Sequence, residues 1–340
     1  MYEEFRGPLT VRDLPDPTPA PNGVVVRVVA SGICRSDWHG WQGHDAEIVL
    51  PQVPGHELTG TIEAVGAGVR RWVVGDPVAV PFIGACGRCP QCAVGDHQVC
   101  PEQTQPGFTD HWGSFAELVA LDAADVNLVR LPEQVSYIAG ASLGCRYATA
   151  FRAVALQGRP RPGQWLAVHG CGGVGLSAVQ VGVATGARVV AVDISPGALQ
   201  MARRLGAEVT IDATGTDVVE AVVEATGGGA HVSVDALGSA QTCINSISCL
   251  RIRGRHVQVG LLPPAQGRPQ LPMELVIGRE LEVVGSHGMA AHDYPDLLGL
   301  VSAGRLDPLA LVTRELTLDE AGEALRNVGS APGIAVITSF

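Results

Sequence analysis

The chain of 340 residues contains no lysine, and only 4 % of it is aromatic and 17 % charged. All 23 basic side chains other than histidine are therefore arginines. Coding bias in the source genome explains this better than selection for the planar guanidinium fork. The formal net charge of −11 argues against non-specific binding to nucleic acid or to an anionic membrane surface. We therefore expect no nucleic-acid partner and no membrane partner.

Targeting and membrane-spanning patterns are also lacking. No charged segment followed by an apolar run opens the sequence, so we predict no secretory leader. The most apolar stretch, Trp165 to Val192, is interrupted by glycines and polar residues, which is typical of strand, helix and strand rather than a membrane span. We expect a cytoplasmic protein. Its nine cysteines then point to metal binding or catalysis before disulfides.

The length predicts about two domains, at roughly 150 residues per domain. The first part is rich in β-formers separated by glycine and proline, which predicts a twisted or barrel-like sheet. Its expected strands are 23–31, 58–65, 76–82 and 115–121. The pattern changes near residue 134, where helical spacing begins and extends to residue 156. The tail, 292–340, has two helical stretches and an apolar strand at 334–338, and we expect it to return to the first domain.

Between these parts, short apolar strands alternate with amphipathic segments such as 197–205 and 216–225. This alternation predicts an α/β domain with a parallel, doubly wound sheet. The expected strands are 165–169, 187–192, 208–211, 231–236, 255–260 and 281–285.

Four cysteines are concentrated in one short run, with the spacing C-x2-C-x2-C-x7-C. They are Cys86, Cys89, Cys92 and Cys100. Four thiolates complete the tetrahedral coordination of zinc, so the predicted site is structural and closed to substrate. Four unrelated buried cysteines, an iron–sulfur cluster and a nucleic-acid-binding zinc ribbon are the weaker alternatives.

Cys34, His56 and Cys145 are distant in sequence but form a Cys2His set, which leaves a fourth zinc position for water or substrate. A lone buried cysteine is usually a small hydrophobe, so spacing alone leaves this second site open. Asp37 supports it, because a carboxylate beside a ligating histidine fixes its tautomer. Glu57 is a candidate auxiliary ligand.

Such a zinc ion would activate an alcohol for hydride loss or polarise a carbonyl. Ser36 and His39 lie close to Cys34 in the sequence and could pass the proton to solvent, with His39 as the terminal base.

A strand, the motif Gly170-x-Gly172-x-x-Gly175 and a helix follow one another, and Asp193 ends the next strand. This context predicts a dinucleotide site in which backbone amides of the loop, including those of Gly173 and Val174, approach the pyrophosphate. Asp193 should bind the adenosine ribose diol and repel a 2′-phosphate, which favours NAD over NADP.

Taken together, the motifs CRSDWH, PGHE, the four-cysteine lobe, SLGC and GCGGVG occur in the order found in zinc-containing medium-chain alcohol dehydrogenases. The chain resembles this family over essentially its whole length. The resemblance implies a GroES-like β-rich catalytic domain at 1–147 and 288–340, with the zinc lobe at about 84–102, and a Rossmann domain at 148–287. It also implies a cleft active site, NAD, two zinc ions per chain, an alcohol, aldehyde or ketone substrate, and a homo-oligomer, either tetramer or dimer.

By the same resemblance, individual positions take on expected roles. Cys34, His56 and Cys145 match the catalytic zinc ligands, Glu57 the nearby acid, Asp37 the carboxylate behind the ligands, and Ser36 and His39 the proton relay. Arg35 matches a residue that contacts the cofactor phosphates. Thr149, Val259 and Gly260 match residues around the nicotinamide. Phe82, Trp41 and Trp112 match residues of the substrate pocket. Many relatives carry a phosphate-binding arginine near the C-terminus where this chain has Ile334.

Three other functions remain open. A polyol dehydrogenase of the same family often has glutamate as its third zinc ligand, so Cys145 argues against it. A zinc-free quinone reductase-like enzyme would have no use for Cys34, His56 and Cys145. A non-catalytic binder of zinc and dinucleotide would not need Ser36 and His39. The sequence does not identify the substrate.

Overall fold

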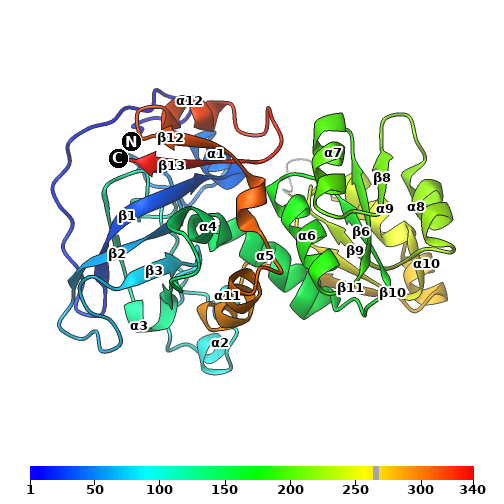
Figure 1. Ribbon diagram of the computed structural model, residues 1–340, viewed down its shortest axis with the longest axis horizontal. Helices are drawn as coiled ribbons and strands as arrows, with labels where there is room; N and C mark the ends of the chain where they lie inside the picture. The colour runs from blue at the N-terminus through cyan, green and yellow to red at the C-terminus, as the bar shows by residue number, and fades with distance from the viewer. Residues whose placement is uncertain (263–267) are drawn as a thin grey trace. The chain divides into compact units, whose positions relative to one another are not determined.

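The computed structural model describes residues 1–262 and 268–340, and the chain forms two compact units (Figure 1). The first comprises Met1–Ala148 and Gly288–Phe340, and the second comprises Thr149–His287. Among the described residues, no helix combines the length and the apolar character needed to cross a membrane.

The first unit is built on a sheet of seven strands. They are β1 (Val24–Ile33), β2 (Glu57–Val65), β3 (Pro77–Val80), β4 (Leu118–Leu121), β5 (Val129–Arg130), β12 (Val312–Thr317) and β13 (Ile334–Ser339). The order is β12-β13-β1-β2-β3-β5, and β4 also pairs with β1. β1 pairs antiparallel with β2, β4 and β13, so the tail of the chain joins the sheet formed by its beginning.

Short helices surround this sheet. They are α1 (Arg35–Trp41), α2 (Pro90–Ala93), α3 (Ala124–Asn127), α4 (Tyr137–Ser142), α11 (Tyr294–Ser302) and α12 (Ala321–Arg326). The helical segment that the sequence predicts at 134–156 is not one regular helix. It begins at Tyr137 and contains two π-helical stretches, Leu143–Tyr147 and Arg152–Gly158, separated by α5 (Ala148–Phe151). Periodicity could not reveal these stretches, because a π turn inserts one residue without changing the apolar character of the segment.

The second unit contains a sheet of six parallel strands. They are β6 (Trp165–His169), β7 (Arg188–Asp193), β8 (Val209–Asp212), β9 (Ala230–Asp235), β10 (Leu250–Gln258) and β11 (Glu282–Gly285). The order β11-β10-β9-β6-β7-β8 is that of a doubly wound sheet, which confirms the predicted fold class. The strand order reverses between β6 and β9, and ligands of such sheets bind at this switch point.

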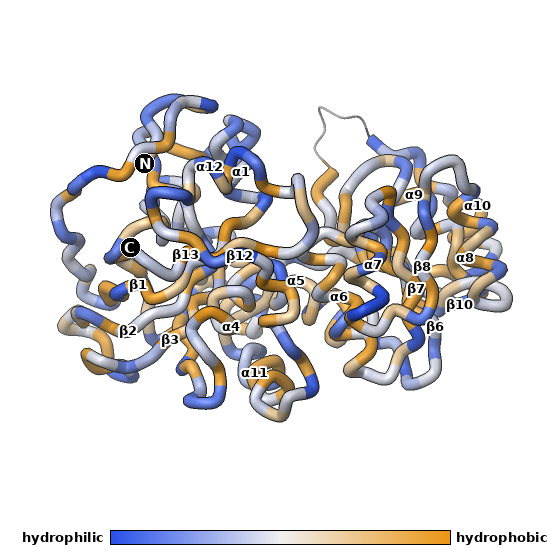
Figure 2. Tube along the Cα trace, turned by 45° about the horizontal axis from the view of Figure 1, so that its top comes forward, coloured by the Kyte–Doolittle hydropathy of each residue, from blue (hydrophilic) through white to orange (hydrophobic). Residues whose placement is uncertain are grey.

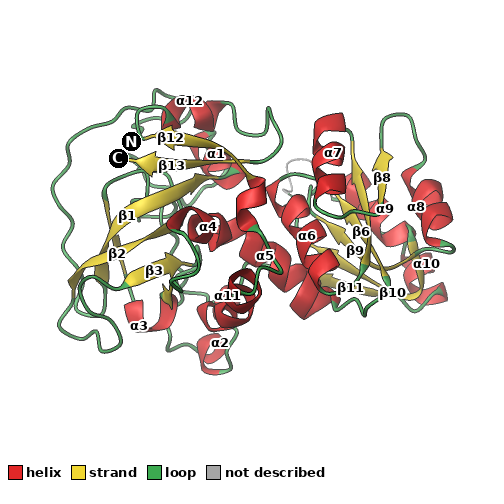
Figure 3. Ribbon diagram, viewed as in Figure 1, coloured by secondary structure: helices red, strands yellow, loops and turns green. Residues whose placement is uncertain are grey.

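Helices cover this parallel sheet (Figure 3). They are α6 (Gly173–Ala184), α7 (Pro196–Arg204), α8 (Val218–Thr226), α9 (Ala240–Ser248) and α10 (Met273–Gly278). α6 packs beside α7, and α8 packs beside α9. All five residues of β6 are buried, as expected for a strand covered on both faces. The hydrophobic stretches along β6 and β7 are visible as orange segments in Figure 2.

Candidate metal centres and dinucleotide loop

Cys34 lies between β1 and α1, where it forms the N-cap of the helix. Its backbone N–H donates a hydrogen bond of 2.9 Å to Oδ2 of Asp37, which lies in the first turn of α1. Both residues are buried. This cap satisfies a backbone donor that would otherwise be buried without a partner, and it fixes where the Cys34 sulfur lies.

The other carboxylate oxygen of Asp37 holds His56, the residue just before β2. Oδ1 accepts hydrogen bonds from Gly55 N at 3.0 Å and from His56 Nδ1 at 2.8 Å. His56 Nε2 is buried and makes no hydrogen bond of normal geometry with any described residue. A buried nitrogen without a partner is costly, so this atom is placed as a metal ligand would be.

Cys145 completes the group and comes from the π-helical stretch Leu143–Tyr147. Single π turns inside α-helices are frequent at functional sites, because they reorient one side chain. The ligand atoms of Cys34, His56, Glu57 and Cys145 all lie within 4.8 Å of one another, and all four residues are buried. The structure thus brings together the three predicted ligands and the predicted acid.

The protonation of this cluster is set by its own members. A hydrogen bond from Cys145 lowers the pKa of the Cys34 thiol well below its usual value, while the same bond and burial raise the pKa of Cys145 well above it. Burial lowers the pKa of His56, but Asp37 and Cys34 outweigh burial and the net pKa is raised well above its usual value. Without metal, these shifts favour a thiolate at Cys34, a thiol at Cys145 and an imidazolium at His56.

Glu57 has a partner that the sequence analysis missed. Arg146, directly after Cys145, donates from Nε to Glu57 Oε1 at 2.9 Å, and its Nη2 donates to Oε2. Burial raises the pKa of Glu57 to about 7 even though Arg146 opposes this. The two-pronged guanidinium bond occupies both carboxylate oxygens, so Glu57 is better placed to anchor Arg146 and the Cys145 turn than to bind metal.

Apolar side chains surround the cluster. Phe82 and Ile83 pack with Cys34 and Cys145 in one small buried group. The ring of Phe108, which sequence reasoning did not select, lies 5.2 Å from the ring of His56. These contacts keep water from one side of the site and lower its local dielectric.

The other two aromatic residues expected in the pocket, Trp41 and Trp112, each donate a hydrogen bond to a backbone carbonyl. Trp41 is buried in a core cluster and donates from Nε1 to Gly7 O at 2.9 Å. Trp112 is 46 % exposed and donates to Pro51 O. Their pocket role stays a prediction, and the packing of Trp41 favours a core role.

The predicted relay residues lie on α1. Ser36 Oγ is 3.8 Å from the Cys34 sulfur. His39 Nδ1 is 2.9 Å from Nδ1 of His44, a residue that the sequence analysis did not select. Burial, followed by the charge of Arg35, lowers the pKa of His39. Arg35 itself is exposed, stacks 4.1 Å over Trp38 and donates to Val328 O.

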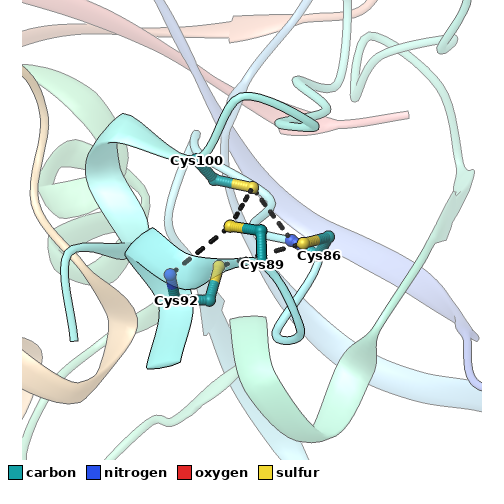
Figure 4. Close-up of side chains that lie close together, drawn as sticks. All are labelled: Cys86, Cys89, Cys92 and Cys100. Atoms are coloured by element: carbon teal, nitrogen blue, oxygen red, sulfur yellow. Dashed lines mark hydrogen bonds between the residues drawn. The ribbon is translucent and has the colours of Figure 1, made fainter. Parts of the chain in front are cut away.

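The four-cysteine cluster forms a second, separate centre in the first unit (Figure 4). The Cys86 and Cys92 sulfurs are 3.9 Å apart, and those of Cys89 and Cys100 are 3.8 Å apart. A tetrahedron with zinc–sulfur bonds of about 2.3 Å has edges of about 3.8 Å, so the spacing fits zinc. All four are free thiols rather than disulfides.

Backbone groups hold this lobe in place. Cys86 N donates to the Cys100 sulfur and Cys92 N donates to the Cys89 sulfur, each at 3.4 Å. Just before the lobe, the side-chain amide of Asn127 bonds both the N–H and the carbonyl of Ala85. Amide hydrogen bonds to sulfur favour the thiolate form that binds metal.

The glycine loop after β6 shows why three glycines are needed there. Gly170 has a positive φ of 90°, which favours glycine. A Cβ on Gly175 would lie 1.7 Å from Gly170 O, whereas a Cβ on Gly172 would meet no atom within 4 Å. The packing of the protein thus explains Gly170 and Gly175. Gly172, the N-cap of α6, instead leaves space over the helix N-terminus, as pyrophosphate binding requires.

Asp193 ends β7, next to this loop. Its carboxylate accepts from Cys171 N at 2.6 Å and from Ser195 N at 2.8 Å, so it ties the loop to the next strand. Directly after β10, Val259 N and Gly260 N both donate to Asp235 O. Thr149 lies in α5 and is buried. All the predicted cofactor residues except Arg35 belong to the second unit.

Comparisons with known proteins agree with this architecture. Residues 20–133 match the alcohol dehydrogenase GroES-like domain, and residues 173–303 match the zinc-binding dehydrogenase model. An alcohol dehydrogenase of Geobacillus stearothermophilus is 32 % identical over 92 % of this chain and 91 % of its own length. The chain belongs to the zinc-containing medium-chain alcohol dehydrogenase family. This confirms the resemblance and the fold, and it makes the protein an oxidoreductase with a dinucleotide-binding domain.

Solved structures support the same assignment. Alcohol dehydrogenase TADH from Thermus sp. ATN1 has a TM-score of 0.92 and 30 % identity, covering 100 % of this chain and 99 % of its own. A putative zinc-binding dehydrogenase from Sinorhizobium meliloti 1021, bound to NADP, has a TM-score of 0.87 and 29 % identity, covering 96 % and 95 %. Because that relative binds NADP, family membership alone does not select NAD.

Proposed function

We propose that this protein is an NAD-dependent alcohol dehydrogenase with two zinc ions per chain. The observation that carries the proposal is the arrangement of His56. Asp37 holds its Nδ1, and its buried Nε2 is left without a partner beside the sulfurs of Cys34 and Cys145. Two sulfurs and one imidazole nitrogen form the ligand set of a catalytic zinc site with one open position.

Zinc bound by Cys34, His56 and Cys145 would act as a Lewis acid on an alcohol or carbonyl oxygen, and NAD would exchange the hydride. The chain's own residues do the remaining work. Asp37 fixes the His56 tautomer. Phe82 and Phe108 shield the site from water. Ser36 lies beside Cys34, where its hydroxyl can accept the alcohol proton and pass it towards His39.

The residues around the second centre give it a structural role. Cys86, Cys89, Cys92 and Cys100 would occupy all four positions of a tetrahedral zinc ion. No position is left for a substrate oxygen, so this lobe stabilises the fold and takes no part in the reaction. Glu57 is not included among the zinc ligands, because Arg146 engages both of its carboxylate oxygens.

The preference for NAD rests on Asp193. Its carboxylate lies next to the glycine loop, where the adenosine ribose of a bound dinucleotide is expected. A negative charge there accepts hydrogen bonds from a ribose diol and repels a 2′-phosphate. The nearest arginine that follows in the sequence, Arg203, donates from Nε to Thr210 Oγ1.

The test is a panel of primary, secondary and polyol substrates assayed for NADH and for NADPH formation, with zinc measured on the same sample. We expect two zinc ions per chain and turnover of at least one simple alcohol with NAD. The proposal fails if the protein holds one zinc ion and reduces neither cofactor with any alcohol. Turnover confined to polyols would move the substrate to the polyol dehydrogenase class.

A further inference from the structure

His39 is one member of a close pair of imidazoles. Its Nδ1 lies 2.9 Å from Nδ1 of His44, and the ring centroids are 5.2 Å apart. Trp38 packs edge-on against both rings, with centroid distances of 5.0 Å to His39 and 5.7 Å to His44. The indole thereby limits how far either ring can turn away from the other.

The turn at the end of α1 places His44 there. Gly43 has a positive φ of 76°, Gly43 N donates to Gly40 O at 2.9 Å, and His44 N donates to His39 O at 3.0 Å. These two bonds form a Schellman motif, which reverses the chain after a helix and returns it over the last turn. A Cβ at Gly43 would lie 2.9 Å from Phe5 Cγ. The local backbone is therefore built to bring the two histidines together.

A nitrogen–nitrogen distance of 2.9 Å requires one donor and one acceptor. If both Nδ1 atoms carried protons the contact would be repulsive, and if neither did there would be no bond. The pair therefore shares one proton between the two Nδ1 atoms. His39 Nε2 and His44 Nε2 remain at the two outer ends of the pair.

The two rings differ in environment. His39 is half-buried, and burial, the charge of Arg35 and the neighbouring His44 lower its pKa, whereas the thiolate of Cys34 raises it. His44 is exposed. Asp45, the acidic residue nearest in sequence, accepts a hydrogen bond from Glu47 N. A proton on His39 is thus disfavoured next to Arg35, and the exposed ring beside it can take that proton out to water.

We propose that His44 is the outlet of the proton relay, so that a pair of imidazoles rather than His39 alone delivers the alcohol proton to solvent. This inference rests on the proposed dehydrogenase function. When His39 Nε2 gains a proton, His39 Nδ1 gives its own proton to His44 Nδ1. His44 then releases the proton on Nε2 to water, and one proton has moved from the substrate to solvent. The pair ends with protons on His39 Nε2 and His44 Nδ1, the tautomers from which the reverse reaction draws a proton from water.

Two variants separate proton transfer from positioning. His44→Asn keeps a side-chain amide that can bond His39 Nδ1 but cannot carry a proton, and His44→Ala removes both abilities. We expect kcat for alcohol oxidation to fall about tenfold in both variants with KM unchanged, and imidazole buffer to restore it at constant pH. His111→Asn, at a half-buried histidine that contacts Asp122, is the control and should show neither effect.

Full activity in His44→Asn would overturn the proposal, because it would show that His44 only positions His39. A loss of activity that added imidazole does not restore would overturn it as well. The pair can also be tested without turnover. Nitrogen NMR of the zinc-loaded wild-type protein should show coupling between the two Nδ1 atoms, and separate titration of the rings without coupling would contradict the pair. If no alcohol is oxidised but the coupling is present, the proposed function fails while the imidazole pair stands.

Discussion

The two cysteine-rich centres of the first unit use similar atoms for opposite purposes. The lobe around Cys86 takes all four ligands from 15 consecutive residues and surrounds them with backbone amide donors. The group around Cys34 draws Cys34, His56 and Cys145 from three separate segments of the chain, and in the proposed function a zinc ion held there would keep one position open. Under the proposed function, zinc stabilises the fold where its ligands are local and complete, and it supports the reaction where the fold assembles an incomplete ligand set.

The largest effect on activity should come from removing a zinc ligand from the group of Cys34, His56 and Cys145, called the open centre below. His56→Ala should lower kcat/KM about 1000-fold, because losing a Lewis acid costs several kcal/mol of transition-state stabilisation. Zinc analysis should find one ion per chain, and the melting temperature should change much less than it does for a lobe variant. Retained activity in a variant that has lost one zinc would show that this centre is not catalytic.

Removing a cysteine ligand from the lobe should lower the stability of the protein and leave its activity nearly unchanged. Cys100→Ser breaks the tetrahedral set, and we expect the free energy of unfolding to fall by about 3 kcal/mol, because loss of a structural metal is among the most damaging changes. Chemical denaturation of the folded fraction measures this. At a temperature where the variant is folded, its kcat should stay within about threefold of wild type, and a catalytic loss as deep as that of His56→Ala would contradict the division of roles.

Acid should release zinc from the open centre. The pKa of His56 and that of Cys145 are both raised in the metal-free site, so both groups carry protons at neutral pH and must lose them to bind zinc. Two released protons make the affinity rise with pH, by about 100-fold per unit below both pKa values. Zinc titration of the open centre in the Cys100→Ser variant, at pH 7 and at pH 8, tests whether the zinc affinity rises with pH. A zinc affinity that does not change with pH would contradict the protonation of His56 and Cys145 in the metal-free site.

The smallest effect should come from Asp37, which does not bind the metal itself but holds the ligand His56. Asp37→Asn keeps the shape of the side chain but removes the charge that holds His56 Nδ1. Such changes typically weaken metal binding by about 10- to 100-fold. Competition with a chelator should show this weakening at the open centre alone. Equal weakening at both centres would mean that Asp37 acts on the fold rather than on His56.

Local patterns allowed much of this to be predicted from the sequence. The glycine loop between β6 and α6 and the four-cysteine run carry their meaning within a few residues, since the strand, the turn and the spacing are all consecutive. The parallel sheet followed from short apolar strands alternating with helices, and its order bears this out.

The rest depends on contacts between distant residues. Arg146 pairs with Glu57 only because η2 (Leu143–Tyr147) lies against β2, and no spacing rule predicts that ion pair. Phe108 reaches His56 from a loop. The proximity of His44 to His39 could have been suspected from a glycine after the last helical residue, which is a common C-terminal cap. The side chain of Trp41 could not be assigned to core or pocket without its bond to Gly7.

The most direct test of the central claim is a chelator titration in which zinc release, alcohol-dependent NADH formation and the unfolding temperature are followed on one sample. We expect activity to disappear with the first zinc equivalent released per chain and the unfolding temperature to fall mainly with the second. Activity that survives until the second equivalent leaves, or unfolding that accompanies the first, would contradict the assignment of chemistry to Cys34, His56 and Cys145 and of stability to the lobe.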